Sequence, residues 1–393
     1  MTRKILIAGA GIGGLTAASC LLEAGFDVEV YEQAPALGEV GAGIQVSANA
    51  ARVLYKLGLK EEIEKLAVRP ESYEFRLFDT GELLQTIPLG EQHEKAHGAP
   101  YYQLHRADIH NILARKAQSL KSNLIHLNST VTRFTEMNDG VELHFANGAT
   151  AKGDILIGAD GIKSAIRKQI VGDTPAEYTG DIAWRLIVPA ERLSEDIMRK
   201  VTAVWVGPGR HAVIYYLRSG KLLNFVGLVA HDEWVEESWT IKAPWQDVKR
   251  DFEGWHADIQ SIIDAADRDQ CYRWALNNRK PISNWSTARA TLLGDSAHPT
   301  LPYLAQGAVM AIEDSAVLAR CLLAEENPSK ALDLYQRSRV DRTARIVNES
   351  TANQTLFHLP SSEALKEAFA KRNIAAERAQ WLYSYDPLTV ELG

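Results

Sequence analysis

Short apolar runs alternate with amphipathic stretches at the start of the chain. Lys4 to Ala8 is an apolar run that predicts a buried strand, and Leu15 to Ala24 has the spacing of a helix that ends at Gly25. A second strand is expected over Phe26 to Glu32, where β-branched and aromatic residues alternate with acidic ones. Together these segments predict a βαβ unit.

Strand patterns dominate the middle of the chain. Tyr73 to Ile87 alternates apolar and polar residues as a half-buried strand pair would, and Asn138-Asp139-Gly140 and Asn147-Gly148 supply turns. From Ile182 to Ala230 the pattern predicts an antiparallel sheet without further parallel crossovers. The expected strands are Val131–Phe134, Val141–Phe145, Asp154–Ile157, Ile182–Val188, Ala203–Val206, Ala212–Leu217 and Leu222–Leu228.

Helical spacing returns after Pro281. A strand over Ala290–Leu293 precedes a helix from about Gly307 to Leu323, and Pro328–Trp381 is expected to be mostly helical, with an interruption near Leu359-Pro360. Two earlier helices are expected over Ala48–Leu57 and His110–Leu120.

Composition and charge exclude several classes of protein. A chain of 393 residues suggests two or three compact units, and a net charge of -7 argues against nucleic acid as the main partner. No apolar stretch approaches the ~20 residues that a membrane span needs. The three cysteines have no CxxC spacing and cannot all form pairs, so a reducing cytoplasm is the expected compartment.

A glycine-rich turn follows the first strand. Gly9, Gly11 and Gly14 match GxGxxG, a pattern in which glycines allow a tight turn, close approach of a pyrophosphate and close packing of helix on strand. Glu32 ends the second strand, where a carboxylate accepts hydrogen bonds from ribose hydroxyls. The alternative is an ordinary glycine-rich turn beside a solvated glutamate.

A second glycine-marked segment lies in the last third of the chain. A strand ends at Gly294-Asp295, and Gly307-Ala308 opens a long helix after a proline-containing loop. Asp295 suits a polyol chain, and a helix N-terminus stabilises the negative charge of a reduced flavin. Two cofactor-binding segments so far apart favour FAD over a simple nicotinamide, although a helix cap with a structural aspartate remains the alternative. A third segment, Asp154 to Gly161, includes Asp160 and suits either a ligand contact or a structural turn.

These motifs resemble those of the single-component FAD-dependent aromatic hydroxylases, the family of p-hydroxybenzoate hydroxylase and salicylate hydroxylase. The resemblance runs from Lys4 to about Leu323 and is strongest toward 6-hydroxynicotinate 3-monooxygenases and 3-hydroxybenzoate 6-hydroxylases. The shared segments are Phe26–Val30, Gly41-Ala42-Gly43-Ile44, Trp274–Pro281 and Ala305-Gln306-Gly307-Ala308.

The resemblance implies an α/β fold in which a Rossmann-like FAD-binding domain is interleaved with a mixed or antiparallel substrate sheet and followed by a helical C-terminus. The expected limits are residues 1–72, 98–180 and 281–325 for the FAD-binding domain, 73–97 and 181–280 for the substrate domain, and 326–393 for the C-terminal region.

The resemblance also implies roles for single residues. Glu32 is expected to bind the FAD ribose, Arg106 to lie on the flavin side, and Asp295 to hold the ribityl chain. Val131 is expected near the adenine. The other expected cofactor residues are Gly9, Gly11, Gly14, Gly43, Asp160, Gly307 and Ala308.

Enzymes of this family use NADH or NADPH and O2, and they deliver oxygen to an activated aromatic ring through a C4a-hydroperoxyflavin. The resemblance therefore implies a monooxygenase for a small phenolic or hydroxypyridine carboxylic acid, as a monomer or homodimer. The alternatives are a hydroxylase or epoxidase of a larger aromatic substrate, and a flavin NADH oxidase or redox sensor. An NAD-dependent dehydrogenase with one Rossmann unit leaves the Gly294 segment unexplained.

Candidate substrate residues lie on the expected middle sheet. His211 and Tyr215 alternate onto one strand face, so they are expected to activate the phenol and to bind an oxygen of the substrate. Gln45 and Tyr303 stand where 6-hydroxynicotinate 3-monooxygenases have histidines, and both are expected to contact the substrate. The alternative for the first pair is a solvated histidine and a core tyrosine.

Other polar and aromatic residues give weaker signals. His298 after Asp295, and the pair His105 and His110, lack clustered metal ligands, so no metal is expected. The nine tryptophans, Trp234, Trp239 and Trp245 among them, are attributed to packing.

Overall fold

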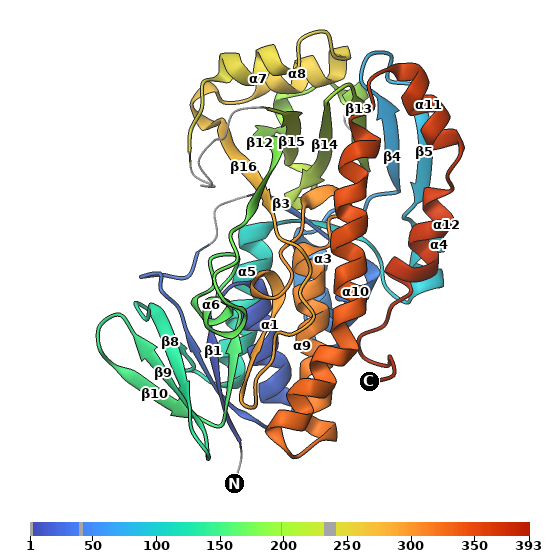
Figure 1. The fold of residues 1–393 in the computed structure, drawn as a ribbon. Coiled ribbons are helices and arrows are strands. Elements are labelled where there is room, and N and C mark those ends of the chain that lie inside the picture. Colours follow the sequence, from blue (N-terminus) through green and yellow to red (C-terminus); the bar gives the residue numbers. More distant parts are fainter. Residues whose placement is uncertain (1–2, 39–41, 198, 232–240) are drawn as a thin grey trace.

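The predicted βαβ unit belongs to a five-stranded parallel sheet (Figure 1). The structure is a computed structural model that describes residues 3–38, 42–197, 199–231 and 241–393. In spatial order the strands are β17 (Ala290–Leu292), β11 (Ile155–Gly158), β1 (Lys4–Ala8), β2 (Asp27–Tyr31) and β7 (Ile125–His126). Because both faces are covered, the central strands are almost continuously apolar.

Helices α1 (Ile12–Glu23), α5 (Arg106–Leu120) and α9 (Gly307–Ala324) pack beside this sheet (Figure 1). Gly13 allows the close approach of α1 and α9, since a Cβ there would lie 2.8 Å from Leu293 Cδ2 and 3.1 Å from Ala311 Cβ. The late helix α9 thus belongs to the same layer as the first helix, as expected for a cofactor domain built from distant segments.

A seven-stranded sheet forms the second part of the molecule. Its order is β16 (Tyr272–Asn278), β12 (Glu177–Pro189), β15 (Leu222–Ala230), β14 (Arg210–Leu217), β13 (Val201–Gly207), β4 (Ser72–Leu77) and β5 (Leu83–Pro88). Within Ile182–Ala230 every strand pairing is antiparallel, as expected, and β4 from earlier in the chain pairs with β13 in parallel, so the sheet is mixed. These strands are far apart in sequence, so no hairpin dictates their relative direction.

The two faces of this sheet have different neighbours. One face packs against α7 (Trp245–Asp251) and α8 (Ala257–Ala265), which lie over the sheet in Figure 1. The other, which we call the inner face, packs against the loop of Tyr303 and the end of α10 (Pro328–Phe357). Along β14, His211, Val213 and Tyr215 belong to the inner face.

Smaller elements complete the fold. The antiparallel sheets are β8 (Val131–Glu136), β9 (Val141–Phe145) and β10 (Thr150–Gly153), and β3 (Gly43–Val46) with β6 (Tyr102–His105). The other helices are α2 (Ala48–Lys56), α3 (Lys60–Leu66), α4 (Glu91–His97), α6 (Ala165–Val171), α11 (Ser362–Ala370) and α12 (Ile374–Arg378). The predicted fold class and the helical C-terminus are confirmed, whereas the domain limits stay a prediction.

The tryptophans that the structure describes are consistent with packing. Trp184, Trp205 and Trp285 are fully buried, and Trp245 packs against the core under α7 and α8. Trp234 and Trp239 lie outside the described residues.

A buried ionic network joins α9 to α10, the long helix beside both sheets in Figure 1. Asp314 accepts from Arg339 Nε at 2.7 Å, from His298 Nε2 at 2.6 Å and from the Gly294 amide at 3.1 Å. Glu313 accepts from Arg339 and Arg342 at 2.7 to 2.8 Å. Both carboxylates and Arg339 are fully buried.

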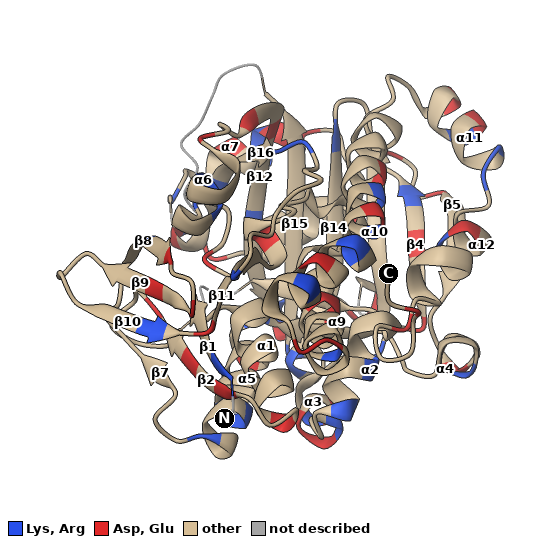
Figure 2. Ribbon diagram, turned by 60° about the horizontal axis from the view of Figure 1, so that its bottom comes forward, with Lys and Arg blue, Asp and Glu red and all other residues tan. Residues whose placement is uncertain are grey.

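Other charges along α10 are exposed. Figure 2 shows basic and acidic residues interspersed on this helix, and Arg337 with Asp333 forms an exposed i,i+4 pair. Such pairs contribute little to stability, so the buried network is the electrostatic feature on which the junction depends.

We expect Asp314→Asn to lower the free energy of unfolding by about 3 kcal/mol, because it leaves the Arg339 charge without a full partner in the interior. Burial raises the pKa of Asp314, but His298 and Arg339 outweigh it and lower the pKa from 3.8 to about 2. A lowered folded-state pKa stabilises the fold above pH 3.8, and this stabilisation is lost as the pH falls toward about 2. Urea denaturation with Asp333→Asn as control tests this; equal midpoints for the two variants would contradict it.

Candidate cofactor and substrate site

Two glycines of the first turn are required by the protein's own packing. Gly9 has φ of +101°, and a Cβ there would lie 2.3 Å from the Ala159 carbonyl oxygen. A Cβ on Gly14 would lie 2.0 Å from the Gly9 carbonyl oxygen. These glycines close the turn between β1 and α1 against the end of β11.

Gly11 has no such packing reason to be glycine. It is the N-cap of α1 in an extended conformation, and no described protein atom lies within 4 Å of the place where its Cβ would be. The open space therefore faces the amide groups and the positive end of α1. This arrangement fits a pyrophosphate that approaches the backbone closely.

Glu32, at the end of β2, stabilises the glycine-rich turn through hydrogen bonds to the backbone. Its carboxylate accepts from the Ala10 amide at 2.8 Å and from the Ala34 amide at 2.9 Å, while its carbonyl accepts from Ser129 at 2.8 Å. Val131 follows two residues later and packs on the cluster around Tyr31. The expected ribose and adenine residues thus lie on neighbouring segments.

His110 supports the same turn from α5, a role that the sequence pattern did not indicate. Its Nε2 lies 2.8 Å from the Ala10 carbonyl oxygen, so this nitrogen carries the proton and donates. The side chain is buried. In the sequence, His110 is a single histidine on an apolar helix face. That local pattern does not indicate a backbone partner so far away along the chain.

Asp160 caps a helix. Its carboxylate accepts from the Ala165 amide at 2.8 Å and from the Ile166 amide at 3.2 Å at the start of α6, and burial raises its pKa. The same helix carries Arg167, which donates to the carbonyls of Ser296 and Ala297 at 2.9 Å. Asp160 therefore has a structural role as a cap of α6. A cofactor contact of Asp160 stays a prediction.

Asp295 lies beside the start of α9. Gly294 has φ of +65° at the end of β17, and the exposed Asp295 follows it. The Asp295 Oδ1 atom is 3.9 Å from the position a Cβ would take on Gly307, the first residue of α9. A carboxylate and a helix N-terminus, with Ala308 in its first turn, thus adjoin one space, which fits a ribityl chain and the electron-rich edge of a flavin.

Arg106 and Gly43 meet at the junction of the two parts. Arg106 begins α5, and its amide donates to the Ala42 carbonyl at 2.8 Å; Gly41 of the same segment lies outside the described residues. The Gly43 amide donates to Asn224 Oδ1 at 3.0 Å. Segments of the cofactor part are thereby attached to the inner face of the large sheet.

Tyr215 packs directly on Gly43. A Cβ on Gly43 would lie 2.4 Å from the Tyr215 hydroxyl oxygen, so glycine is required for the ring to lie there. Burial raises the pKa of Tyr215, while a hydrogen bond with Gln45 lowers it. Gln45 also accepts from the Tyr101 hydroxyl at 2.6 Å. Tyr215 and Gln45 therefore form one polar pair, with Tyr101 as a member that the sequence did not single out.

His211 and Tyr303 form a second pair. Their ring centroids are 5.1 Å apart, and His211 is buried, which excludes the solvated histidine. Burial, and then His358, lower the pKa of His211 well below its ordinary value, so the ring is neutral near pH 7. The Tyr303 hydroxyl donates to Asp181.

The two pairs lie toward opposite ends of the inner face. His211 and Tyr215 are four positions apart on β14, which corresponds to about 13 Å of strand. The four expected substrate residues are thus brought to one face, two at each end.

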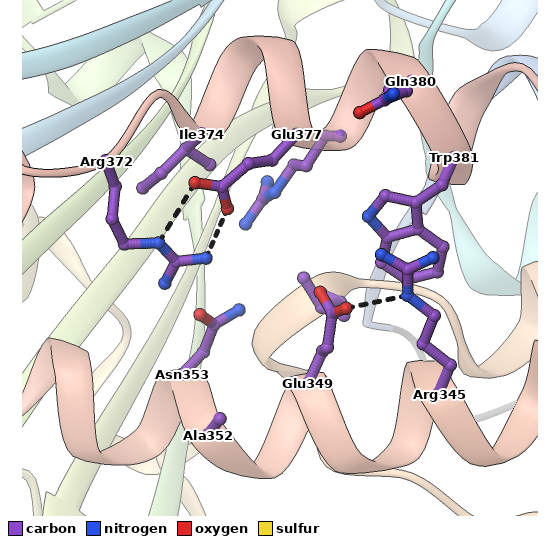
Figure 3. A pocket seen from close by; sticks show the side chains of 11 residues that line it. Arg345, Glu349, Ala352, Asn353, Arg372, Ile374, Glu377, Gln380 and Trp381 are labelled. Atoms are coloured by element: carbon purple, nitrogen blue, oxygen red, sulfur yellow. Dashed lines mark hydrogen bonds and ion pairs between the residues drawn. The ribbon is translucent and has the colours of Figure 1, made fainter.

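A cavity of about 330 Å³ lies apart from these residues, between α10 and the C-terminal helices (Figure 3). Its charged groups largely satisfy each other: Arg372 pairs with Glu377, and Arg345 pairs with Glu349. Leu304, next to Tyr303, lines its inner end. Among the described residues, no group of His, Cys, Asp and Glu is arranged to hold a metal, and no helix is long and apolar enough to cross a membrane.

Comparison with known proteins agrees with the geometry. The profile of an FAD binding domain matches residues 2–350. The chain belongs to the FAD-dependent aromatic hydroxylases. One curated relative is 3-amino-4-hydroxybenzoate 2-monooxygenase PtmB3 of Streptomyces platensis, which is 37% identical over 98% of this chain and 97% of the relative. Another is 3-hydroxybenzoate 6-hydroxylase of Polaromonas naphthalenivorans (strain CJ2), which is 39% identical over 97% of this chain and 96% of the relative.

A solved structure supports the same family. The crystal structure of Klebsiella pneumoniae HpxO complexed with FAD and uric acid has a TM-score of 0.86 to this hydroxylase at 27% identity, covering 97% of each chain. FAD is therefore the cofactor of this hydroxylase, and the unobstructed position at Gly11 and the proximity of Asp295 to the start of α9 fit its two ends.

The glycines of this hydroxylase provide a matched test of cofactor binding. We expect Gly11→Ala to leave the stability of the apoprotein unchanged, since no described atom obstructs the new methyl group, and to weaken FAD binding at least about tenfold. Gly14→Ala should instead destabilise the apoprotein, because its methyl group meets the Gly9 carbonyl.

Flavin fluorescence titration and thermal unfolding of the apoproteins separate these outcomes. Normal FAD affinity in Gly11→Ala would contradict the assignment of the open space to the cofactor.

Proposed function

We propose that this hydroxylase uses NADH or NADPH and O2 to hydroxylate a small phenolic or hydroxypyridine carboxylic acid. The observation that carries the proposal is the inner face of β14, which brings His211 into contact with Tyr303 and, four residues along the strand, Tyr215 into contact with Gln45 and with Gly43 of the cofactor part. The substrates named for the two curated relatives are hydroxybenzoates, which supports a small aromatic acid.

The proposal assigns a role to each cofactor residue that the family resemblance implies. Gly9, Gly11 and Gly14 shape the pyrophosphate turn and Glu32 binds the ribose, while Val131 lies by the adenine. Arg106, Asp295 and the start of α9 hold the flavin end. Bound FAD supplies the oxygen-transfer chemistry of the family when NAD(P)H has reduced it.

His211 is the proposed base. Its pKa lies well below the ordinary value, so it is unprotonated at neutral pH and can accept the phenolic proton. Removal of that proton makes the ring electron-rich, which attack by an electrophilic oxygen requires. Tyr303, in ring contact with His211, is proposed to contact the same end of the substrate.

Tyr215 and Gln45 orient the opposite end of the substrate. Tyr215 keeps its proton, since burial raises its pKa, and therefore acts as a donor. The neighbouring Asn224 has a buried amide nitrogen with no hydrogen-bond partner among the described residues, which is a second donor near this end. Arg185 on the adjacent strand adds positive charge, which favours a carboxylate.

The proposal also includes the partners, the compartment and the oligomeric state. The partners are the aromatic acid, NAD(P)H and O2, the compartment is the cytoplasm, and the enzyme acts as a monomer or homodimer.

A panel of hydroxybenzoates, aminohydroxybenzoates and hydroxypyridine acids tests the proposal. We expect at least one to accelerate NAD(P)H oxidation and to form one hydroxylated product per NAD(P)H, detected by mass spectrometry. His211→Gln should slow hydroxylation at least about 100-fold with FAD retained, as loss of a general base does. Tyr215→Phe should mainly weaken substrate binding.

Peroxide formation without product for every compound would instead indicate an NAD(P)H oxidase. Unchanged rate and coupling in both variants would remove His211 and Tyr215 from the site.

A further inference from the structure

His211 is in contact with a second histidine at the end of α10. Its Nδ1 lies 2.8 Å from His358 Nε2, and the ring centroids are 5.1 Å apart. The backbone holds this contact in place, because the Gly209 amide donates to the His358 carbonyl at 3.2 Å. The C-terminal helix thus reaches the strand that carries the proposed base.

The other side of His358 faces a carboxylate. His358 Nδ1 is 3.7 Å from Asp181 Oδ1 on β12. Asp181 Oδ2 accepts from the Tyr303 hydroxyl and from Gln354 Nε2, the latter at 2.8 Å. His358 therefore lies between His211 and a carboxylate that is itself held from two directions.

These partners select one tautomer for each ring. The Asp181 carboxylate is 3.7 Å from Nδ1 of His358, too far for a hydrogen bond, but its negative charge favours a proton on that nitrogen, which leaves Nε2 as the acceptor. His211 then donates from Nδ1, and its Nε2 is left without a proton. That is the state in which His211 can accept a proton from a phenol.

His358 is the most exposed member of this chain of contacts. His211 and Asp181 are buried, whereas His358 is partly exposed. Burial and Arg210 lower the pKa of His358, and Asp181 opposes them, with a net lowering. Among the described residues, these are the titratable and charged groups that face the pair, with Tyr303 bound to Asp181, and both rings are neutral near pH 7.

We propose that His358 is a positioning residue that holds His211 in the accepting tautomer and carries its proton toward solvent. The proposal rests on the proposed function. The phenol O–H bond breaks and its proton binds His211 Nε2, while the proton on His211 Nδ1 moves to His358 Nε2. The proton on His358 Nδ1 then leaves toward Asp181 or water, so both rings end neutral and the substrate keeps the electron pair.

The test is a single-turnover measurement on the FAD-loaded enzyme with the best phenolic acid from the panel. We expect His358→Gln to retain FAD and substrate affinity, because Gln preserves a hydrogen bond, but to slow hydroxylation about 100-fold at pH 7. The rate should recover as the pH rises, since an already ionised phenol needs no relay. His358→Ala should regain rate with added imidazole. His144→Gln, a histidine on β9 far from this site, is the matched control.

A second readout needs no turnover. The absorbance of the bound phenol, titrated in the oxidised enzyme, should show its ionisation shifted to higher pH in His358→Gln and unchanged in His144→Gln. If native enzyme hydroxylates while His358→Gln matches His144→Gln in rate, pH profile and ligand ionisation, the relay is wrong and the proposed function stands. If no phenolic acid binds or is hydroxylated by the native enzyme, both are wrong.

Discussion

The junction between α9 and α10 depends on two adjacent carboxylates buried in α9. Asp314 binds the Gly294 amide, His298 and Arg339, and Glu313 binds Arg339 and Arg342. Charges are costly to bury unless every one is paired, so this network tolerates few other arrangements. Because Gly294 precedes Asp295, the same contacts that attach α10 to α9 also fix the loop on the flavin side.

The buried ionic network also affects the substrate side of the molecule, because α10 runs from α9 to the large sheet. The helix begins next to α9 and ends at Phe357, one residue before His358. Its first half is held by the ionic network, and its last turns pack on the inner face of the large sheet. The position of His358 beside His211 is therefore set by the junction that also sets the cofactor loop. At the other end of the inner face, the absence of a side chain at Gly43 leaves room for the Tyr215 ring, where β3 meets the large sheet.

Local patterns in the sequence were enough to predict much of this. The βαβ unit and the strands of the large sheet follow from periodicity, and the turn at Gly9 from steric requirements that only glycine meets. The placement of His211 and Tyr215 on one face of a strand needed only the two-residue period. A mixed sheet was expected, but the parallel partner of β4 could not be identified from the sequence, because β4 and β13 have no local connection.

The same limit explains the site residues that the sequence did not reveal. His110, Asp181 and His358 act through partners that only the folded chain brings near. Asp160 followed an Asp-Gly pattern that suits a ligand or a turn equally, and only the structure showed that its carboxylate caps α6. Spacing identified the cofactor segments, whereas substrate residues depend on contacts between distant strands and helices.

The central claim, that this chain is a monooxygenase whose two parts enclose FAD and a small aromatic acid, is tested most directly by isotope labelling. Turnover under ¹⁸O2 in ordinary water should give a product that contains one ¹⁸O atom. A hydroxylated product that takes its oxygen from water, or ¹⁸O found only in hydrogen peroxide, would contradict the account.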